Sequence, residues 1–312
     1  MSKDQEALVI DVGGETNETP RLNYKNYGNI IFYVLNILFT YGIGVAGWTG
    51  TPTNEELSLK YQTLITPKSS AFSIWAVIFT FQGVFAILQL VPSYRGRPMV
   101  QEGVSFWHMI FCVMQIGWTF AFAYEVIPLS LVFMLLLWIS LMALIISQYY
   151  VKLDPSTSSC SKEGLNEFWF LRFPFQIHAG WITAASALNV SVVAVDAGSA
   201  PATQLAVGII CLAALHAISV WHLFGYKRPN YTIPCVLIWA NGWIYGELQE
   251  PKQLILDTFD QSVISGVAYA AFTVSMVIII QVVLRLAFLI YNYALGKSYL
   301  QEKVEEEEED EV

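Results

Sequence analysis

Long apolar runs recur along the chain and are separated by short polar segments. A transmembrane helix needs roughly 20 mainly apolar residues, and runs such as 105–124, 126–149 and 263–284 have about that length. Lipid offers the peptide backbone no hydrogen-bond partner, so such runs must be helical. The pattern therefore predicts an all-α fold, a polytopic integral membrane helical bundle.

Eight spans are predicted from these runs. They are residues 29–48, 71–90, 104–124, 127–149, 173–193, 204–223, 232–248 and 262–284. The seventh is the weakest, because it is short and contains Pro234, Asn241 and Gly242. A broken or re-entrant helix, shielded from lipid by protein, is the alternative for this segment.

The basic residues predict the orientation of the bundle. With eight spans both termini lie on one side, and that side receives thirteen Lys and Arg residues. The other side receives only Lys60, Lys68 and Lys252. Cytoplasmic loops carry such an excess of positive charge. We therefore expect both termini to be cytoplasmic, and the sequence selects no particular membrane.

Composition agrees with a membrane protein and sets the two tails apart. The chain is 55% hydrophobic and 13% charged, whereas soluble domains carry about 25% charged residues. The net charge of −9 lies largely in residues 305–311, which are all acidic. We expect disordered tails over 1–28 and 296–312, because such segments cannot bury a core. A solvated tail is the favoured interpretation of the acidic run, and a basic protein partner is the alternative.

The sequence contains no pattern typical of an enzyme or a nucleic-acid-binding protein. The four cysteines show no metal-binding spacing. His216 and His222 are six residues apart and fall on different faces of a helix. Neither a Ser/His/Asp set, nor a phosphate-binding Gly loop, nor a basic face is present. We expect no catalytic residues, no metal site and no nucleic-acid partner, and no cofactor is indicated with certainty.

Polar residues lie among aromatic residues in three stripes at helical spacing. The stripes are Phe72, Trp75, Phe79 and Gln82 in the second span, Trp107, Phe111, Gln115, Trp118 and Phe122 in the third, and His178, Trp181, Ala185 and Asn189 in the fifth. A polar side chain facing hydrocarbon is costly, so each stripe should face the bundle interior. Such faces suit a planar, largely apolar ligand, and helix packing alone is the alternative. A hydrogen-bonded core histidine is the favoured interpretation of His178, ahead of a haem ligand.

Three segments carry a family resemblance: TPKSSAFSIWAVIFTFQG (66–83), MQIGWTFAF (114–122) and FQIHAGWITAASALNV (175–190). In this order they resemble the tryptophan-rich sensory protein family, also called translocator or peripheral benzodiazepine receptor-like proteins. Trp75 and Trp118 take the places of the tryptophans of the family's second and third helices. The fifth-helix match is the most specific, and it comprises Trp181, Ala185, Leu188 and Asn189. Gln115 replaces the family's asparagine, and Ile177–His178 replace its Pro-Tyr pair.

The resemblance implies a five-helix membrane core over 29–195, followed here by a three-helix extension over 196–295. It also implies a hydrophobic small-molecule ligand, of the tetrapyrrole or sterol class, that is bound, sensed or transported. The expected ligand-binding residues are Trp75, Phe79, Gln115, Trp118, Phe122, His178, Trp181, Ala185 and Asn189. Two other functions remain as alternatives: a secondary transporter that uses all eight spans with Asn241 at its site, and a scaffold acting through the acidic tail. The lipid bilayer is the expected surrounding partner, and a homodimer is left open.

Overall fold

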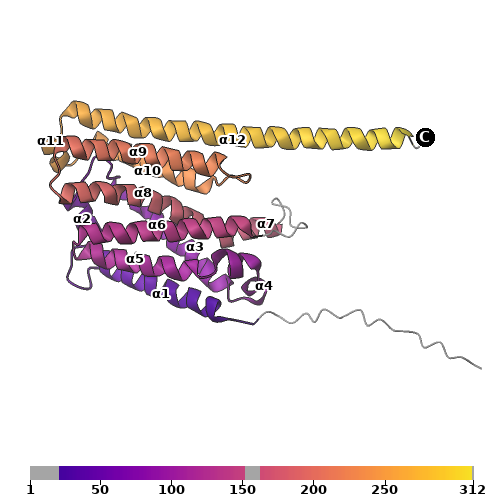
Figure 1. The fold of residues 1–312 in the computed structure, drawn as a ribbon, viewed down its shortest axis with the longest axis horizontal. Coiled ribbons are helices and arrows are strands. Elements are labelled where there is room, and N and C mark those ends of the chain that lie inside the picture. The colour runs from indigo at the N-terminus through magenta and orange to yellow at the C-terminus, as the bar shows by residue number, and fades with distance from the viewer. Residues whose placement is uncertain (1–20, 152–161, 311–312) are drawn as a thin grey trace, which may run out of the picture.

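The computed structural model describes residues 21–151 and 162–310, and over these residues it is a helical bundle without strands (Figure 1). The elements are α1 (Tyr24–Gly44), α2 (Asn54–Lys60), η1 (Ser69–Ser73), α3 (Ile74–Leu88), α4 (Pro92–Arg95), η2 (Met99–Val104), α5 (Trp107–Ala123), α6 (Ile127–Tyr150), α7 (Lys162–Glu167), η3 (Phe168–Arg172), α8 (Phe173–Asp196), α9 (Pro201–Phe224), α10 (Thr232–Gln249), α11 (Gln253–Thr258) and α12 (Gln261–Asp310). The all-α prediction is confirmed.

Seven helical segments in the described part of the chain are long and apolar enough to cross a membrane. They are Tyr24–Gly44, Ser69–Leu88, Met99–Ala123, Ile127–Tyr150, Gly164–Asp196, Pro201–Phe224 and Gln261–Leu295. Each coincides with a predicted span. The chain is therefore an integral, multi-pass membrane protein.

The remaining predicted span is α10, which is less apolar than the others but runs unbroken for 18 residues. The alternative of a broken helix is wrong. Pro234 lies in the first turn, where a backbone N–H has no helical partner to lose. The Nδ2 of Asn241 donates to the carbonyl of Leu237 at 2.8 Å, whereas its buried Oδ1 has no hydrogen-bond partner. Asn241 and Glu247 are both buried against neighbouring helices, so α10 keeps its polar groups away from lipid.

Successive long helices alternate in direction along the bundle (Figure 1). Helix α1 begins, and α12 finishes, at the same end, whereas α2 and α11 lie at the opposite end. This arrangement requires α10 to cross the bundle between α9 and α12. The crossing of the membrane by α10, and with it the eight-span topology, stays a prediction, because α10 is not among the seven helices that are apolar enough to count as spans.

One hydrophobic cluster unites the first five long helices with the last three. It contains Phe111 and Phe175 from the predicted five-helix core, together with Leu215 of α9, Leu237 of α10 and Ile278 of α12. Helices α8 and α10 approach closely at Gly180, where an added Cβ would lie 2.8 Å from the Cβ of Val236. The last three spans are therefore packed into the same core rather than attached beside it.

The bounds of the outer helices differ from the predicted tails. Residues 1–20 and 311–312 lie outside the described part. Helix α1 already begins at Tyr24, because Asn23 and Asn26 form a reciprocal capping box at its start. Helix α12 continues to Asp310, through the acidic segment for which composition predicted disorder. Glutamate is a good helix former, and extending an existing helix is easier than nucleating one.

Candidate functional site

The first group of predicted site residues is an aromatic cluster between α3 and α8. The ring of Trp75 lies 5.3 Å from that of Phe79, 5.6 Å from His178 and 6.4 Å from Trp181, measured between centroids. Phe72 meets Trp181 edge-on at 5.4 Å. Four of the nine predicted residues are thus brought together, and their rings contact one another directly.

A buried polar pair lies beside this aromatic cluster. Gln82 Nε2 and His178 Nδ1 are 2.8 Å apart, and both residues are fully buried. The amide donates, so a neutral imidazole carries its proton on Nε2. That Nε2 and the Oε1 atom of Gln82 are buried and have no hydrogen-bond partner in the protein. The pair therefore keeps one donor and one acceptor free.

The second group of predicted residues joins α5, α6 and α8. Trp118 stacks on Phe122 with a centroid distance of 5.2 Å. Its Nε1 donates to Asn189 Oδ1 at 3.2 Å, and Asn189 Nδ2 donates to Ser130 Oγ at 3.2 Å. Ala185 is half-buried on the same helix as Asn189. Asn189, which the family resemblance selected, thus links α8 to α5 and α6 through its side-chain hydrogen bonds.

Gln115 faces α1 rather than α8. Asn36 Nδ2 donates to Gln115 Oε1 at 3.1 Å, and Gln115 Nε2 is buried without a partner. The sequence analysis missed the α1 side of this contact. The signal was present, because Asn26, Asn29, Asn36 and Thr40 follow helical spacing along α1, and all are buried.

His108 was also missed. Its ring is fully buried among Phe85, Phe111 and Phe175 at centroid distances of 5.7, 4.9 and 5.9 Å, and neither ring nitrogen has a partner. The predicted third-span stripe began at Trp107, which is only half-buried. His108 precedes Phe111 by three residues and Gln115 by seven, so the same spacing rule could have selected it.

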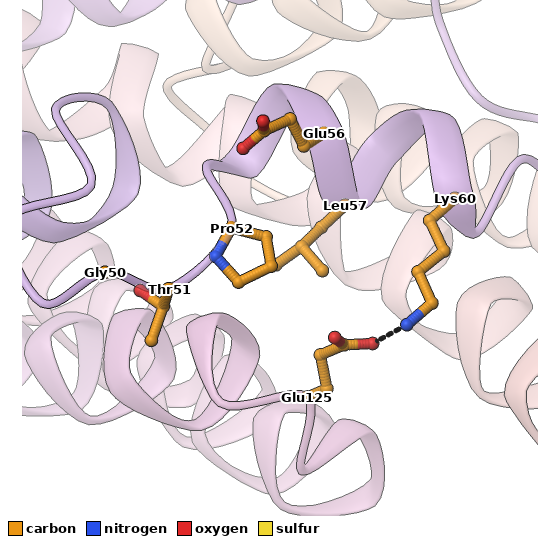
Figure 2. A pocket seen from close by; sticks show the side chains of 7 residues that line it. All are labelled: Gly50, Thr51, Pro52, Glu56, Leu57, Lys60 and Glu125. Carbon is orange, nitrogen blue, oxygen red and sulfur yellow. Dashed lines mark hydrogen bonds and ion pairs between the residues drawn. The ribbon is translucent and has the colours of Figure 1, made fainter.

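A pocket of about 430 Å³ opens beneath the first loop (residues 45–68), which connects α1 to η1 and contains α2. It is lined by Gly50, Thr51, Pro52, Glu56, Leu57, Lys60 and Glu125. Figure 2 shows Lys60 and Glu125 reaching toward each other across it, and the two form an ion pair. Tyr61 also donates to Glu125, at 2.7 Å. These bonds, from Lys60 foremost, hold the pKa of the Glu125 carboxyl below its ordinary value.

A second pocket, a groove of about 450 Å³, lies between α3, α8 and the start of α10. Its walls include Val77, Phe173, Cys235 and Trp239. None of the nine predicted site residues lines either pocket. Their side chains instead fill the space between the helices, with polar groups that bond to one another or have no partner.

Comparison with known proteins agrees with this architecture. A family model described as TSPO-like protein matches residues 26–284. The chain belongs to this family. The match runs through α9 and α10 into α12, so the TSPO-like region is not confined to the first five spans. No curated protein and no solved structure matches the chain. In the part of this TSPO-like protein that the structure describes, no three His, Cys, Asp or Glu residues are grouped to hold a metal ion.

Proposed function

We propose that this TSPO-like protein binds a planar hydrophobic ligand of the tetrapyrrole or sterol class among α3, α5 and α8, and senses or moves it. Membership of the family indicates a membrane protein that binds or senses a ligand. The narrower proposal rests on the side chains that α3, α5 and α8 direct toward one another. Flat aromatic rings with a few polar groups suit such a ligand.

The observation that carries the proposal is a set of buried polar atoms without partners on these aromatic faces. They are Gln82 Oε1 and His178 Nε2. Leaving a buried donor or acceptor unpaired costs about 1–3 kcal/mol. A ligand that carries its own donors and acceptors recovers this cost when it enters, whereas a core built only for packing gains nothing from it.

Ligand entry requires the rings to separate, because they contact one another in the present arrangement. Trp75 is the residue to move, since it contacts Phe79, His178 and Trp181 and is itself only half-buried. Its displacement would open the Gln82–His178 pair to a ligand that stacks on the remaining rings. Tryptophan fluorescence would report such a displacement.

The test is porphyrin quenching of tryptophan fluorescence in the purified protein. Trp181→Ala removes stacking area, and Asn189→Leu removes the hydrogen bonds of the amide at similar bulk. Each should weaken porphyrin binding by about 1 kcal/mol or more, the scale of an aromatic contact or a hydrogen bond. Trp221→Ala on α9 is the matched control, because Trp221 is exposed and contacts His222 and Tyr226 instead. Unchanged affinity in folded Trp181→Ala and Asn189→Leu proteins would return these residues to a packing role.

The alternative of a secondary transporter with its site at Asn241 has one supporting observation, the buried Asn241 Oδ1 without a hydrogen-bond partner, but it lacks the helix geometry that it needs. It required an interrupted seventh helix whose exposed backbone ends could bind a solute. Helix α10 is continuous, and the side-chain amide of Asn241 already donates within the helix. The scaffold alternative depends on the acidic side chains of residues 305–311, whose placement the structure does not describe.

A further inference from the structure

The first loop bridges two parts of the bundle, and its first half packs on the five-helix core. Leu57 of α2 is fully buried in a cluster with Phe122, Ile127 and Val192, and Trp118 packs against the same cluster. Lys60 and Tyr61 follow with their bonds to Glu125. Leu57 therefore lies directly over the Trp118–Phe122 end of the proposed ligand site.

The second half of the loop is buried in the last three spans. Leu64 and Ile65 are 3% and 1% exposed. They belong to a cluster with Leu212 of α9, Leu248 of α10 and Ile264 of α12. This cluster is separate from the one around Leu57. Two apolar anchors therefore hold the loop, one in each part of the bundle.

Polar bonds strengthen the second anchor. Gln62 Nε2 donates to Glu247 Oε1 at 3.0 Å, and the two residues are 4% and 5% exposed. Lys252 lies 3.8 Å from the same carboxylate oxygen. The backbone N–H of Lys68 donates to the carbonyl of Trp243 at 3.1 Å. Glu247 is thus a buried carboxylate whose contacts come from the loop and from the start of α11.

We infer that the last three spans hold the first loop closed over the core, with Gln62 and Glu247 as its positioning residues, and thereby set the rate of ligand entry and exit. The inference rests on the proposed function, because it names the regulation of that same site. Helix α2 has only 7 residues, and isolated helices this short are not stable in water. Its position over Trp118 must therefore depend on what fixes the chain on either side of it.

Hydrogen exchange of the loop tests this anchoring without any ligand. The variants are Gln62→Leu, which alters only the loop, Glu247→Gln, which keeps an acceptor oxygen, and Glu247→Leu, which removes it. We expect Gln62→Leu and Glu247→Leu to speed exchange of the α2 amides about tenfold, equivalent to about 1.4 kcal/mol, and Glu247→Gln to have a smaller effect. Asp257→Asn on α11 is the matched control, because Asp257 bonds to Gln253 and not to the loop. Faster exchange restricted to residues 62–66 would overturn the inference.

Stopped-flow porphyrin binding tests the effect on access. Gln62→Leu should raise the association and dissociation rates together, by a factor similar to that seen in exchange, with little change in affinity. Loss of affinity with an unchanged association rate would contradict a gating role. Absence of porphyrin and sterol binding to the parent protein would instead refute the proposed function. The exchange measurement would still decide whether the last three spans position the loop.

Discussion

Asn189 is a buried polar residue whose side chain forms hydrogen bonds with two other helices. From α8 it accepts a hydrogen bond from Trp118 on α5 and donates one to Ser130 on α6. A single amide thereby sets the register of three helices. A membrane gives helices little hydrophobic reason to associate, so such bonds matter for specificity even where each contributes little free energy.

Graded loss of stability should follow from removing these bonds in turn. Ser130→Ala removes the contact of the hydroxyl with Asn189 but leaves the Trp118 bond intact, and it should cost about 0.6 kcal/mol, the typical value for such a contact in a membrane bundle. Asn189→Leu removes both and also leaves Trp118 Nε1 unpaired, so its cost should be larger. Unfolding in detergent measures both effects. Equal stability of the two variants would show that the Trp118 bond contributes nothing.

The ion pair between Lys60 of the first loop and Glu125 gives a pH-dependent prediction. Lys60 and Tyr61 lower the pKa of Glu125, and Glu125 in turn raises the pKa of Lys60. A carboxylate whose pKa is lowered by its partners stabilises the folded arrangement at pH values above its ordinary pKa. That stabilisation is lost as the pH falls through the lowered pKa. An amine whose pKa is raised by its partner stabilises the folded arrangement at pH values below its ordinary pKa. That stabilisation is lost only as the pH rises through the raised pKa. The bonds of Lys60 and Tyr61 to Glu125 should therefore persist through the neutral pH range and weaken in acid.

A spin label on a cysteine that replaces the exposed Glu55 of α2, in a background with Cys160→Ser and Cys235→Ser, reports this loosening. We expect label mobility to rise on acidification below the ordinary range of a glutamate. Glu125→Gln should be mobile at all pH values and show no acid transition. A transition that survives in Glu125→Gln would assign it to another group.

At the level of elements, residue spacing was enough to locate the helices. It did not decide which of two neighbouring residues faces the core, nor whether a helix runs without a break. Periodicity identified the third-span stripe, yet it placed Trp107 where the structure buries His108. His108 fits the helical spacing to Phe111 and Gln115 as well as Trp107 does, so periodicity alone gave no reason to choose between these two neighbours. The continuity of α10 was equally hidden, because its polar residues are acceptable only where other helices cover them.

Close packing of α8 on α10 gives a prediction about glycine. Gly180→Ala would place a methyl group 2.8 Å from the Cβ of Val236, which is attached to the backbone and cannot swing aside. Overpacking of this kind costs about 1–3 kcal/mol, so the melting temperature should fall. Gly266→Ala on α12 meets nothing within 4 Å and should leave stability unchanged or higher. Equal melting temperatures would show that α8 and α10 can move apart without cost.

For the whole molecule, the hydrophobic pattern was sufficient to predict a membrane bundle, and the motifs were sufficient to predict its family. The same information could not predict the bond between Gln62 and Glu247, which are 185 residues apart. Neither residue belongs to a motif, and each looks like an ordinary loop or helix-end residue in the sequence. Contacts of this kind depend on which helices become neighbours, so only the assembled bundle reveals the connection between the first loop and the last three spans.

The assembled bundle also sharpens the prediction of topology. Lys60 lies in α2 and Lys252 directly precedes α11, both at the end of the bundle opposite the start of α1. Most other basic residues should lie at the end where the described chain begins and finishes. Since positive charge favours the cytoplasmic face, we expect both termini, and the 225–231 connection between α9 and α10, to be cytoplasmic. Residues 250–252 should face the other compartment.

Compartment-specific labelling at these four places tests this topology. The comparison of 225–231 with 250–252 decides whether α10 crosses the membrane, independently of the tails. Labelling of both segments from one side would show that α10 does not cross, despite its length of 18 residues. The termini would then lie on opposite sides of the membrane, and Lys and Arg would be distributed more evenly between the two sides. Labelling from opposite sides, with both termini on the side of 225–231, establishes eight crossings and leaves the first loop on the face away from the acidic C-terminal segment.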